Sequence, residues 1–372
     1  MKRSLGRKRI AVFKPYNARH TTAFYGAQHT LFRYMQDRFG MDFTYFVDDP
    51  AVSFEGVRMA YLRKSAVGTL LTGAYKLLLS DQVKYPFYWT VGFTDFDVVI
   101  TEGVYYSLLH YVRQCAPKVI LNDSLSRDPG FSPRRVRYLN RHFRRARAVV
   151  VTERVRSVYA SYGIAIPVTV IGHPVSTTEI QFRKRMAPPR RLVSVGRLVR
   201  EKGYDVIIDA VADVAEAHQD VTLDIFGSGP LEDVLTRRIG ARRMESRIRL
   251  RGRVAREALV RQLSEYDLLI SHPLTTRRSA EAFLMANVEA MAAGLPVITS
   301  DCGGVRTVVR DNAVVVAERN VQGLREALER FVCGGEDIGT RSAMGRRFVE
   351  ENYALDVIAE KWRGVIDAVD VS

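Results

Sequence analysis

Two carboxylates with a short apolar run between them are the first residues in the sequence whose spacing suggests chemistry. Glu281 and Glu289 stand eight positions apart, separated by Ala282–Val288. If Glu281 lies in a loop and Glu289 in the helix that follows, the helix N-terminus between them offers backbone N–H groups and a positive dipole end. The stretch therefore predicts an anion site. The alternative is that Glu289 is a solvated helix residue and Glu281 a first-turn acid that the dipole favours.

The residues around the two glutamates predict the elements that would position them. Met285–Ala293 is rich in helix formers, Gly294 can end a helix in the left-handed conformation, and Pro296 forbids its continuation. Val297–Ser300 is typical of a short buried strand. We therefore expect Glu289 inside a helix that packs beside a strand.

Two cations lie upstream on a second predicted strand and loop. Leu192–Val195 predicts the strand, and Gly196, Arg197 and Lys202 lie on the loop that leaves it. Glycine allows close backbone approach, arginine can bind phosphate oxygens through two N–H groups, and lysine supplies a point charge. This pattern suits a nucleotide diphosphate; the alternative is a pair of solvated surface cations.

Together these segments resemble the retaining glycosyltransferases of family 4, the glycosyl transferases group 1. The family carries G-R-L followed by E-K-G, seen here as Gly196–Leu198 and Glu201–Gly203. It also carries a Glu, seven residues, Glu motif continuing as E-A-M-A-x-G-x-P-V, seen here as Glu281 and Glu289–Val297. The resemblance covers Leu192–Val309 well and the first half only in architecture. It implies an α/β protein of the GT-B fold, with two Rossmann-like doubly wound domains facing a cleft.

The resemblance also implies roles for individual residues. Glu281 would lie beside the donor sugar as the catalytic carboxylate, and Glu289 would hold the ribose hydroxyls. The segment that ends at Val254 would lie near the nucleobase. Phe283 and Leu284 belong to the loop beside the sugar, where relatives have Gly-Phe-Gly after the first Glu and this chain has Ala-Phe-Leu.

The first half supplies two further candidates. A loop after the strand Arg9–Lys14 ends at Gly26, where the family usually has a Gly-Gly pair beside the donor phosphates and this chain has Gly-Ala. Asp123 follows the predicted strand Lys118–Leu121, and strand carboxyl ends line the ligand crevice of such sheets. Asp123 is therefore a catalytic candidate on the acceptor side, with a cap of the following turn as the alternative.

Composition and patterning predict two domains in a soluble or peripheral protein. The chain has 372 residues, 47% of them hydrophobic and 26% charged. We expect an acceptor-binding domain over residues 1–176 and a nucleotide-sugar-binding domain over residues 190–355, with the helix at 356–372 packing back on the first. The start lacks the features of a signal peptide, and the apolar run at 65–80 is too short to span a membrane. The three cysteines have no metal-ligand spacing, which predicts reduced thiols, a cytoplasmic protein and no metal site.

The net positive charge lies entirely in the first half. Residues 1–190 hold 30 Lys and Arg against 13 Asp and Glu, net +17, and residues 191–372 hold 26 against 28, net −2. Ser132-Pro133 predicts a helix start, and an arginine stripe is expected to face outward from that helix. The stripe consists of Arg134, Arg137, Arg141 and Arg145, joined by Arg135 and Arg144. Such a face predicts an anionic partner, for which we favour a membrane surface over simple solvation.

We therefore expect a metal-independent, retaining hexosyltransferase. It would move a sugar from a nucleotide-diphosphate sugar, its co-substrate, to a glycan or lipid-linked acceptor in the assembly of cell-envelope polysaccharide or glycolipid. No cofactor and no nucleic-acid partner are predicted, and the protein would be peripheral on the inner face of the cell membrane. The alternatives are a nucleotide-sugar epimerase of the same fold, a basic nucleic-acid-binding protein supported only by the arginine helix, and a transferase-like domain that has lost activity.

Overall fold

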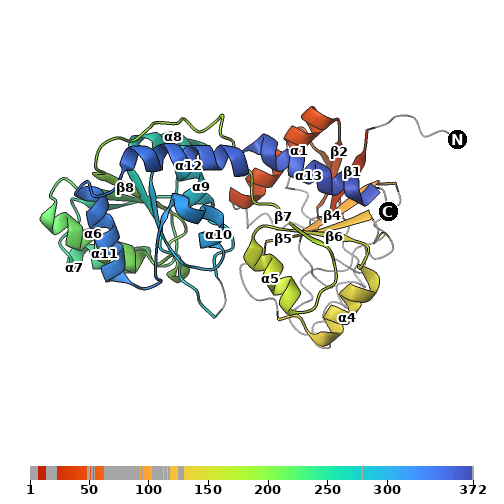
Figure 1. The fold of residues 1–372 in the computed structure, drawn as a ribbon, viewed down its shortest axis with the longest axis horizontal. Coiled ribbons are helices and arrows are strands. Elements are labelled where there is room, and N and C mark those ends of the chain that lie inside the picture. Colours follow the sequence, from red (N-terminus) through yellow and green to blue (C-terminus); the bar gives the residue numbers. More distant parts are fainter. Residues whose placement is uncertain are drawn as a thin grey trace. The chain divides into compact units, whose positions relative to one another are not determined.

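The chain divides into two compact units in this computed structural model. The first comprises residues 1–125, 129–172 and 358–372, and the second residues 126–128 and 173–357. The structure describes residues 7–13, 23–47, 51, 53, 55–62, 92–93, 95–102, 112, 115, 118–124, 130–277 and 280–370. Each unit has its own parallel sheet (Figure 1).

The sheet of the first unit has seven parallel strands among the described residues, in the order β3-β2-β1-β4-β5-β6-β7. The strands are β1 (Arg9–Phe13), β2 (Asp42–Val47), β3 (Arg58–Tyr61), β4 (Val98–Glu102), β5 (Val119–Asp123), β6 (Arg147–Val150) and β7 (Val168–Val170). Strand order reverses between β1 and β4. Open sheets of this kind bind ligands outside the carboxyl ends of the strands at such a reversal.

Aromatic side chains pack two helices of the first unit against its sheet and against each other. The described helices are α1 (Ala23–Phe39), α4 (Pro133–His142), α5 (Glu153–Ser161) and the end of α13 (Leu355–Asp370). Phe32 of α1 stacks on Phe43 of β2 with centroids 4.7 Å apart, and Trp362 of α13 meets the Phe32 ring edge-on at 5.6 Å. The last helix therefore packs on α1 (Figure 1).

The sheet of the second unit has, in the part of the chain that the structure describes, six parallel strands in the order β10-β9-β8-β11-β12-β13. The strands are β8 (Arg191–Val195), β9 (Thr222–Phe226), β10 (Ile248–Gly252), β11 (Leu268–Ile270), β12 (Val297–Ser300) and β13 (Val314–Val316). The order reverses between β8 and β11, so the loops that leave these two strands lie next to each other.

Helices cover both faces of this second sheet (Figure 1). They are α6 (Tyr204–Ala217), α7 (Glu232–Ala241), α8 (Arg256–Gln262), α9 (Met285–Ala292), α10 (Val305–Val309), α11 (Val321–Val332) and α12 (Ile338–Asn352), with 3₁₀ turns at Arg200–Lys202, Leu263–Glu265 and Arg310–Asn312. Helices α6, α7 and α11 form one layer, and α9 and α12 pack together on the other face. Right-handed crossovers produce this division, because connections that run in opposite directions along the sheet cross on opposite faces.

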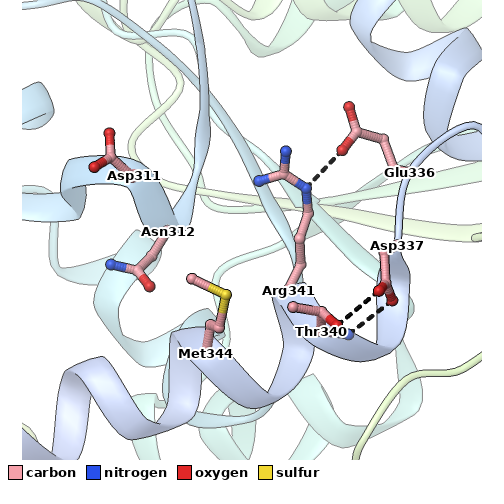
Figure 2. Close-up of a pocket in the computed structure, with 7 residues that line it drawn as sticks. All are labelled: Asp311, Asn312, Glu336, Asp337, Thr340, Arg341 and Met344. Atoms are coloured by element: carbon pink, nitrogen blue, oxygen red, sulfur yellow. Dashed lines mark hydrogen bonds and ion pairs between the residues drawn. The ribbon is translucent and has the colours of Figure 1, made fainter.

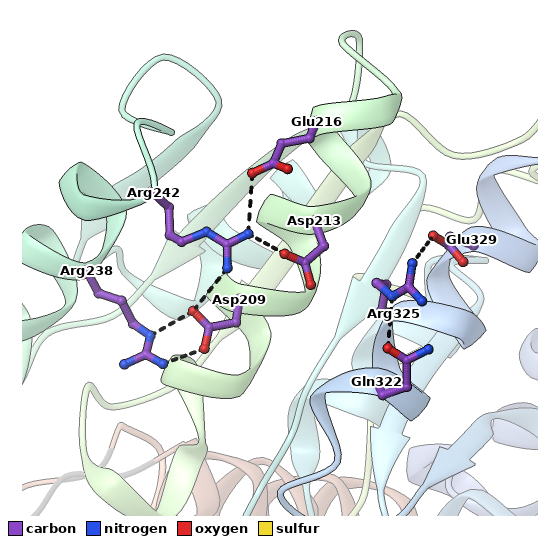
Figure 3. Close-up of polar contacts among 8 residues, drawn as sticks. All are labelled: Asp209, Asp213, Glu216, Arg238, Arg242, Gln322, Arg325 and Glu329. Atoms are coloured by element: carbon purple, nitrogen blue, oxygen red, sulfur yellow. Dashed lines mark hydrogen bonds and ion pairs between the residues drawn. The ribbon is translucent and has the colours of Figure 1, made fainter.

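Ion pairs join α6 to α7 on the surface of the second unit (Figure 3). Arg238 pairs with Asp209, and Arg242 reaches Asp213 and also Glu216 at 3.4 Å. These groups are partly exposed, so each pair contributes about 0–1 kcal/mol. The stability of the unit rests instead on its apolar core, to which α6 alone contributes the fully buried side chains of Ile207, Ile208, Val211 and Val214, among others.

The predicted α/β class with two doubly wound parallel sheets is confirmed, and most predicted strands and helices lie within two residues of their observed bounds. Strand β3 was not predicted. The apolar run at 65–80 falls outside the described residues. None of the described helices is both long and apolar enough to cross a membrane.

Candidate active site

A lysine and a glutamate from adjacent loops form the centre of the candidate site. Lys202 lies on the loop after β8, and Glu281 lies on the loop between β11 and α9. Lys202 Nζ donates to Glu281 Oε2 at 2.6 Å. The two side chains are 18% and 21% exposed, so the pair is reachable but largely desolvated. The sequence predicted both residues, and the structure brings them into direct contact.

The loop that carries Lys202 is pressed against the loop after β11. Gly203 has φ +61°, and a Cβ there would lie 2.2 Å from the carbonyl oxygen of His272. Leu274 N–H donates to the carbonyl of Glu201 at 2.8 Å. A glycine is therefore required beside Lys202, both for the left-handed backbone and for the close approach of the two loops.

The backbone of Glu281 is fixed on its other side by the turn after β12. Gly303 has φ +60°, and a Cβ there would lie 2.1 Å from the carbonyl oxygen of Glu281. Gly304 N–H donates to that carbonyl at 2.7 Å. The carboxylate of Glu281 is thus held from a rigid backbone rather than from a free loop.

Glu289 is buried inside α9 and paired with an arginine that the sequence analysis did not single out. Its side chain is 7% exposed, and Arg256 reaches Oε1 with Nε at 2.9 Å and Nη2 at 2.7 Å. Burial raises the pKa of the Glu289 carboxyl, and the Arg256 guanidinium counteracts this. Both Arg256 bonds go to one oxygen, so Oε2 is left for another donor. The one signal in the sequence for Arg256 was its position two residues after Val254, which had been predicted to lie near the nucleobase.

The N-terminus of α9 lies between Glu281 and Glu289, as predicted. No side chain caps it, and its first turn holds no acidic residue. Phe283 and Leu284 lie just ahead of the helix with buried side chains, and Phe283 packs edge-on against His173 at 4.9 Å and Tyr353 at 5.3 Å. These two predicted binding residues can therefore meet a ligand through their backbone, not their side chains.

Three polar side chains bind the carbonyl groups at the C-terminal end of α9. Arg346 donates to Ala292 at 2.8 Å, Arg185 to Ala293 at 2.7 Å, and Ser342 to Gly294 at 2.7 Å. Cations at this end also interact favourably with the helix dipole. The sequence gave no local signal for these contacts, because their partners lie 48 to 108 residues away.

The remaining predicted residues of the second unit lie at the surface. Arg197 is 70% exposed and its guanidinium lies 3.9 Å from Glu201. Val254 is partly exposed between β10 and α8. Both are accessible to a ligand, and Arg197 would have to order its side chain on binding.

In the first unit, two expectations need correction. Gly26 lies within α1, which begins at Ala23, and not in the loop before the helix. Arg135 was expected to face outward but is buried, with its guanidinium 4.6 Å from the centroid of Phe131. The physical reason is helical geometry: Arg135 lies four residues before buried Leu139 and so shares its inward face.

Asp123 is the last residue of β5 and is buried. The hydroxyl of Tyr159, in α5, donates to its Oδ2 at 2.8 Å. The raised pKa of Tyr159 has desolvation as its largest cause and Asp123 as its second. Asp123 lies where strand carboxyl ends bind ligands, but its position next to Tyr159 also fits a structural role.

A pocket of about 290 Å³ opens elsewhere on the second unit (Figure 2). It is lined by Asp311, Asn312, Glu336, Asp337, Thr340, Arg341 and Met344. Two of its three acidic groups have partners in the protein: Glu336 pairs with Arg341 at 2.7 Å, and Asp337 accepts from the Thr340 backbone at 2.9 Å to cap α12. None of the predicted site residues lines this pocket.

Part of the second unit is similar to a known protein family. Residues 176–347 match the model of the family Glycosyl transferases group 1. One component of the human phosphatidylinositol N-acetylglucosaminyltransferase is 29% identical over 48% of this chain and 36% of its own length. A GDP-mannose-dependent phosphatidylinositol monomannoside mannosyltransferase from Mycobacterium tuberculosis is 26% identical over 50% of each chain. An amylovoran biosynthesis glycosyltransferase from Erwinia amylovora is 29% identical over 50% of this chain and 47% of its own. The chain thus spans half or less of these relatives.

Solved structures match the whole chain in fold. A glycosyltransferase from Rickettsia africae superposes with a TM-score of 0.75 at 14% identity, over 98% of both chains. Anabaena HepE, in complex with UDP and glucose, has a TM-score of 0.71 at 14% identity, over 97% of this chain and 100% of its own. At these identities the likeness establishes the fold.

Proposed function

We propose that this chain, which belongs to the group 1 glycosyltransferases through residues 176–347, is a retaining, metal-independent enzyme that transfers a sugar from a nucleotide-diphosphate sugar. The observation that carries the proposal is the Lys202–Glu281 contact of 2.6 Å beside the uncapped N-terminus of α9. A cation, a carboxylate and a helix N-terminus lie on the loops at the carboxyl ends of the central strands. This combination suits a sugar linked to a diphosphate.

In this proposal each residue acts on one part of the donor. Lys202, Arg197 and the N–H groups ahead of α9 hold the diphosphate and stabilise the charge that develops on it, the task a divalent cation performs in other enzymes. Oε2 of Glu289 accepts from a ribose hydroxyl, and Glu281 orients the sugar. Binding of the donor must exchange the Lys202–Glu281 ion pair for contacts of Lys202 with phosphate and of Glu281 with sugar hydroxyls.

The transfer step then needs few further groups. The acceptor hydroxyl attacks the anomeric carbon on the face that the diphosphate leaves, so one C–O bond breaks and another forms with retained configuration. The proton of the acceptor passes to an oxygen of the departing β-phosphate. No protein nucleophile is needed, and Glu281 acts by positioning.

The test of the function is binding of nucleotides and sugar nucleotides. UDP, GDP, UDP-glucose, UDP-GlcNAc and GDP-mannose are each added while thermal unfolding is followed, because a ligand that binds the folded state raises the melting temperature. At least one is expected to do so, with transfer or slow hydrolysis of the matching sugar nucleotide. Conversion of the sugar without transfer or hydrolysis would instead favour an epimerase.

Glu289→Gln is expected to weaken binding of the stabilising nucleotide about 10-fold or more. The amide presents one acceptor in place of two carboxylate oxygens, so either Arg256 or the ribose loses its partner, which costs about 1.5–3 kcal/mol. Isothermal titration gives the affinity. Exposed Glu257→Gln, on the neighbouring α8, is the control and should bind as the wild type does. Equal affinity in Glu289→Gln and wild type would contradict the ribose assignment.

For the acceptor, we propose a lipid-linked molecule at an anionic membrane surface. Two relatives are named for phosphatidylinositol or phosphatidylinositol monomannoside. In the first unit, an arginine patch of Arg134, Arg137, Arg141 and Arg145 is exposed on and just after α4. Near an anionic leaflet each basic side chain contributes about 1 kcal/mol, so four can hold the protein weakly at the surface.

Reversing the four charges of the arginine patch to glutamate is expected to abolish sedimentation with anionic liposomes at low salt. Nucleotide affinity should stay unchanged. The matched control reverses four exposed arginines of the second unit, Arg237, Arg249, Arg261 and Arg347, for the same change in net charge. If the wild type ignores anionic liposomes, or if both variants lose binding equally, the patch is not the membrane contact.

A further inference from the structure

Hydrogen bonds connect Glu318, in the turn before α11, to Cys302, which precedes the glycine turn that holds the backbone of Glu281. Glu318 accepts from Thr275 twice, from the hydroxyl at 2.5 Å and from the backbone N–H at 2.6 Å. The Thr275 hydroxyl oxygen lies 3.5 Å from the sulfur of Cys302. Cys302 leads directly into Gly303 and Gly304, which contact the carbonyl of Glu281, and the carboxylate of Glu281 binds Lys202. We call Glu318, Thr275 and Cys302 the relay.

The carboxylate at one end sets the direction of every bond in the relay. An ionised carboxylate only accepts, so the single hydroxyl proton of Thr275 is directed to Glu318. The hydroxyl oxygen is then left to accept the proton of the Cys302 thiol. The side chain of Cys302 is thereby fixed at the start of the turn that binds the carbonyl of Glu281. Each group has one arrangement that satisfies its neighbours, which fixes the geometry along the chain.

A second set of contacts holds Thr275 in place. Arg319, the residue after Glu318, donates from Nη2 to the Thr275 carbonyl at 2.9 Å, and its backbone N–H donates to His272 Nε2 at 3.0 Å. Arg319 has φ +59°, a conformation that residues with a Cβ rarely adopt. The turn therefore keeps an unfavourable backbone while it binds both ends of the segment from His272 to Thr275.

We infer that Glu318 is a positioning residue for Glu281 and acts through the hydroxyl of Thr275 and the thiol of Cys302. Glu318 is 17% exposed and has no direct contact with Glu281 or Lys202 in the structure. Its effect on catalysis rests on the proposed function, in which Glu281 orients the donor sugar. Loss of the relay leaves the nucleotide contacts intact and lets the sugar-orienting carboxylate move.

The test replaces the middle of the relay by isosteric groups. Thr275→Val keeps the shape and removes the hydroxyl, whereas Thr275→Ser restores it. We expect Thr275→Val to lower turnover of the stabilising sugar nucleotide about 10-fold, since small misplacement of a reacting group has effects of this order or larger. Affinity for UDP or GDP alone should change less than 2-fold. Thr275→Ser should recover most of the turnover.

A matched carboxylate separates positioning from general stability. Glu336 is 14% exposed, pairs with Arg341 at 2.7 Å, and lies in the pocket of Figure 2. Glu318→Gln and Glu336→Gln are compared for melting temperature and turnover. Both should lower the melting temperature, and only Glu318→Gln should lower turnover. Equal turnover losses in the two variants would mean that Glu318 acts only through stability.

The reactivity of the Cys302 thiol tests the relay without a sugar nucleotide. In a Cys115→Ser, Cys333→Ser background, Cys302 is the remaining thiol of the chain and is fully buried. Its reaction with a disulfide reagent should be slow and should speed up at least several-fold in Thr275→Val. If the thiol reacts faster in Thr275→Val but the wild type binds no nucleotide, the proposed function is wrong and the relay is still supported. Unchanged reactivity and unchanged turnover in Thr275→Val would overturn the relay.

Discussion

Replacing Lys202 by alanine is expected to lower the rate of sugar transfer at least about 100-fold, the scale seen when a donor to developing charge is removed. Lys202 is the largely desolvated cation of the site, and low exposure strengthens its interaction with a leaving diphosphate. Arg197→Ala is expected to lose as much, because both cations would neutralise the same group. Initial rates with the stabilising sugar nucleotide measure both. Full activity in either variant would contradict the assignment.

Two comparisons sharpen this prediction. Glu281→Gln removes the carboxylate that occupies Lys202 at 2.6 Å, so binding of UDP or GDP should be retained or strengthened while turnover falls. Lys202→Ala should instead weaken binding and lower turnover. A chelator of divalent cations should leave the transfer rate of the wild-type enzyme unchanged. A strict requirement for a divalent cation would defeat the proposal that the two cations replace a metal.

The sequence allowed the centre of the second unit to be predicted because its signals are local. Helix formers followed by Gly294 and Pro296 placed the end of α9, and Gly294 has the left-handed φ of +83°. Alternation of strand, loop and helix then placed Lys202 and Glu281 at carboxyl ends of strands. Their contact could not be predicted from local signals, because Lys202 and Glu281 are 79 residues apart in the chain. It depends on the parallel sheet, in which β8 and β11 are neighbours.

The groups that support the site could not be predicted in the same way. Arg256, Arg185 and Glu318 are charged residues in polar segments, where solvent exposure is the usual outcome. Each acquires its role from a partner far along the chain, such as Glu289 for Arg256 or Thr275 for Glu318. No periodicity or short motif encodes such a pairing. In the first unit, Arg135 was predicted to face outward because arginine is usually exposed, although its position in the helix places it on the buried face.

One of these supporting residues, Arg185, binds several carbonyl groups at once. Its guanidinium donates to Tyr266 at 2.7 Å, to Ser264 at 3.0 Å, to Leu263 at 3.1 Å and to Ala293 at 2.7 Å. Burial lowers the pKa of Arg185 to about 10, so the side chain remains charged at neutral pH. It joins the segment before β8, the 3₁₀ turn before β11 and the end of α9.

Arg185→Ala is therefore expected to destabilise the second unit by about 3 kcal/mol or more. Several buried carbonyl groups lose their donor at once, and each unsatisfied group costs about 1–3 kcal/mol unless water replaces the side chain. The suitable measurement is hydrogen exchange of peptides from α9 and β12 as urea increases, because Trp362, the tryptophan that the structure describes, lies in the first unit. Lys184→Ala, at the adjacent exposed position, should stay within about 0.5 kcal/mol of the wild type. A loss below about 1 kcal/mol in Arg185→Ala would show that the carbonyl groups find other donors, and that α9 does not depend on this arginine to present Glu289.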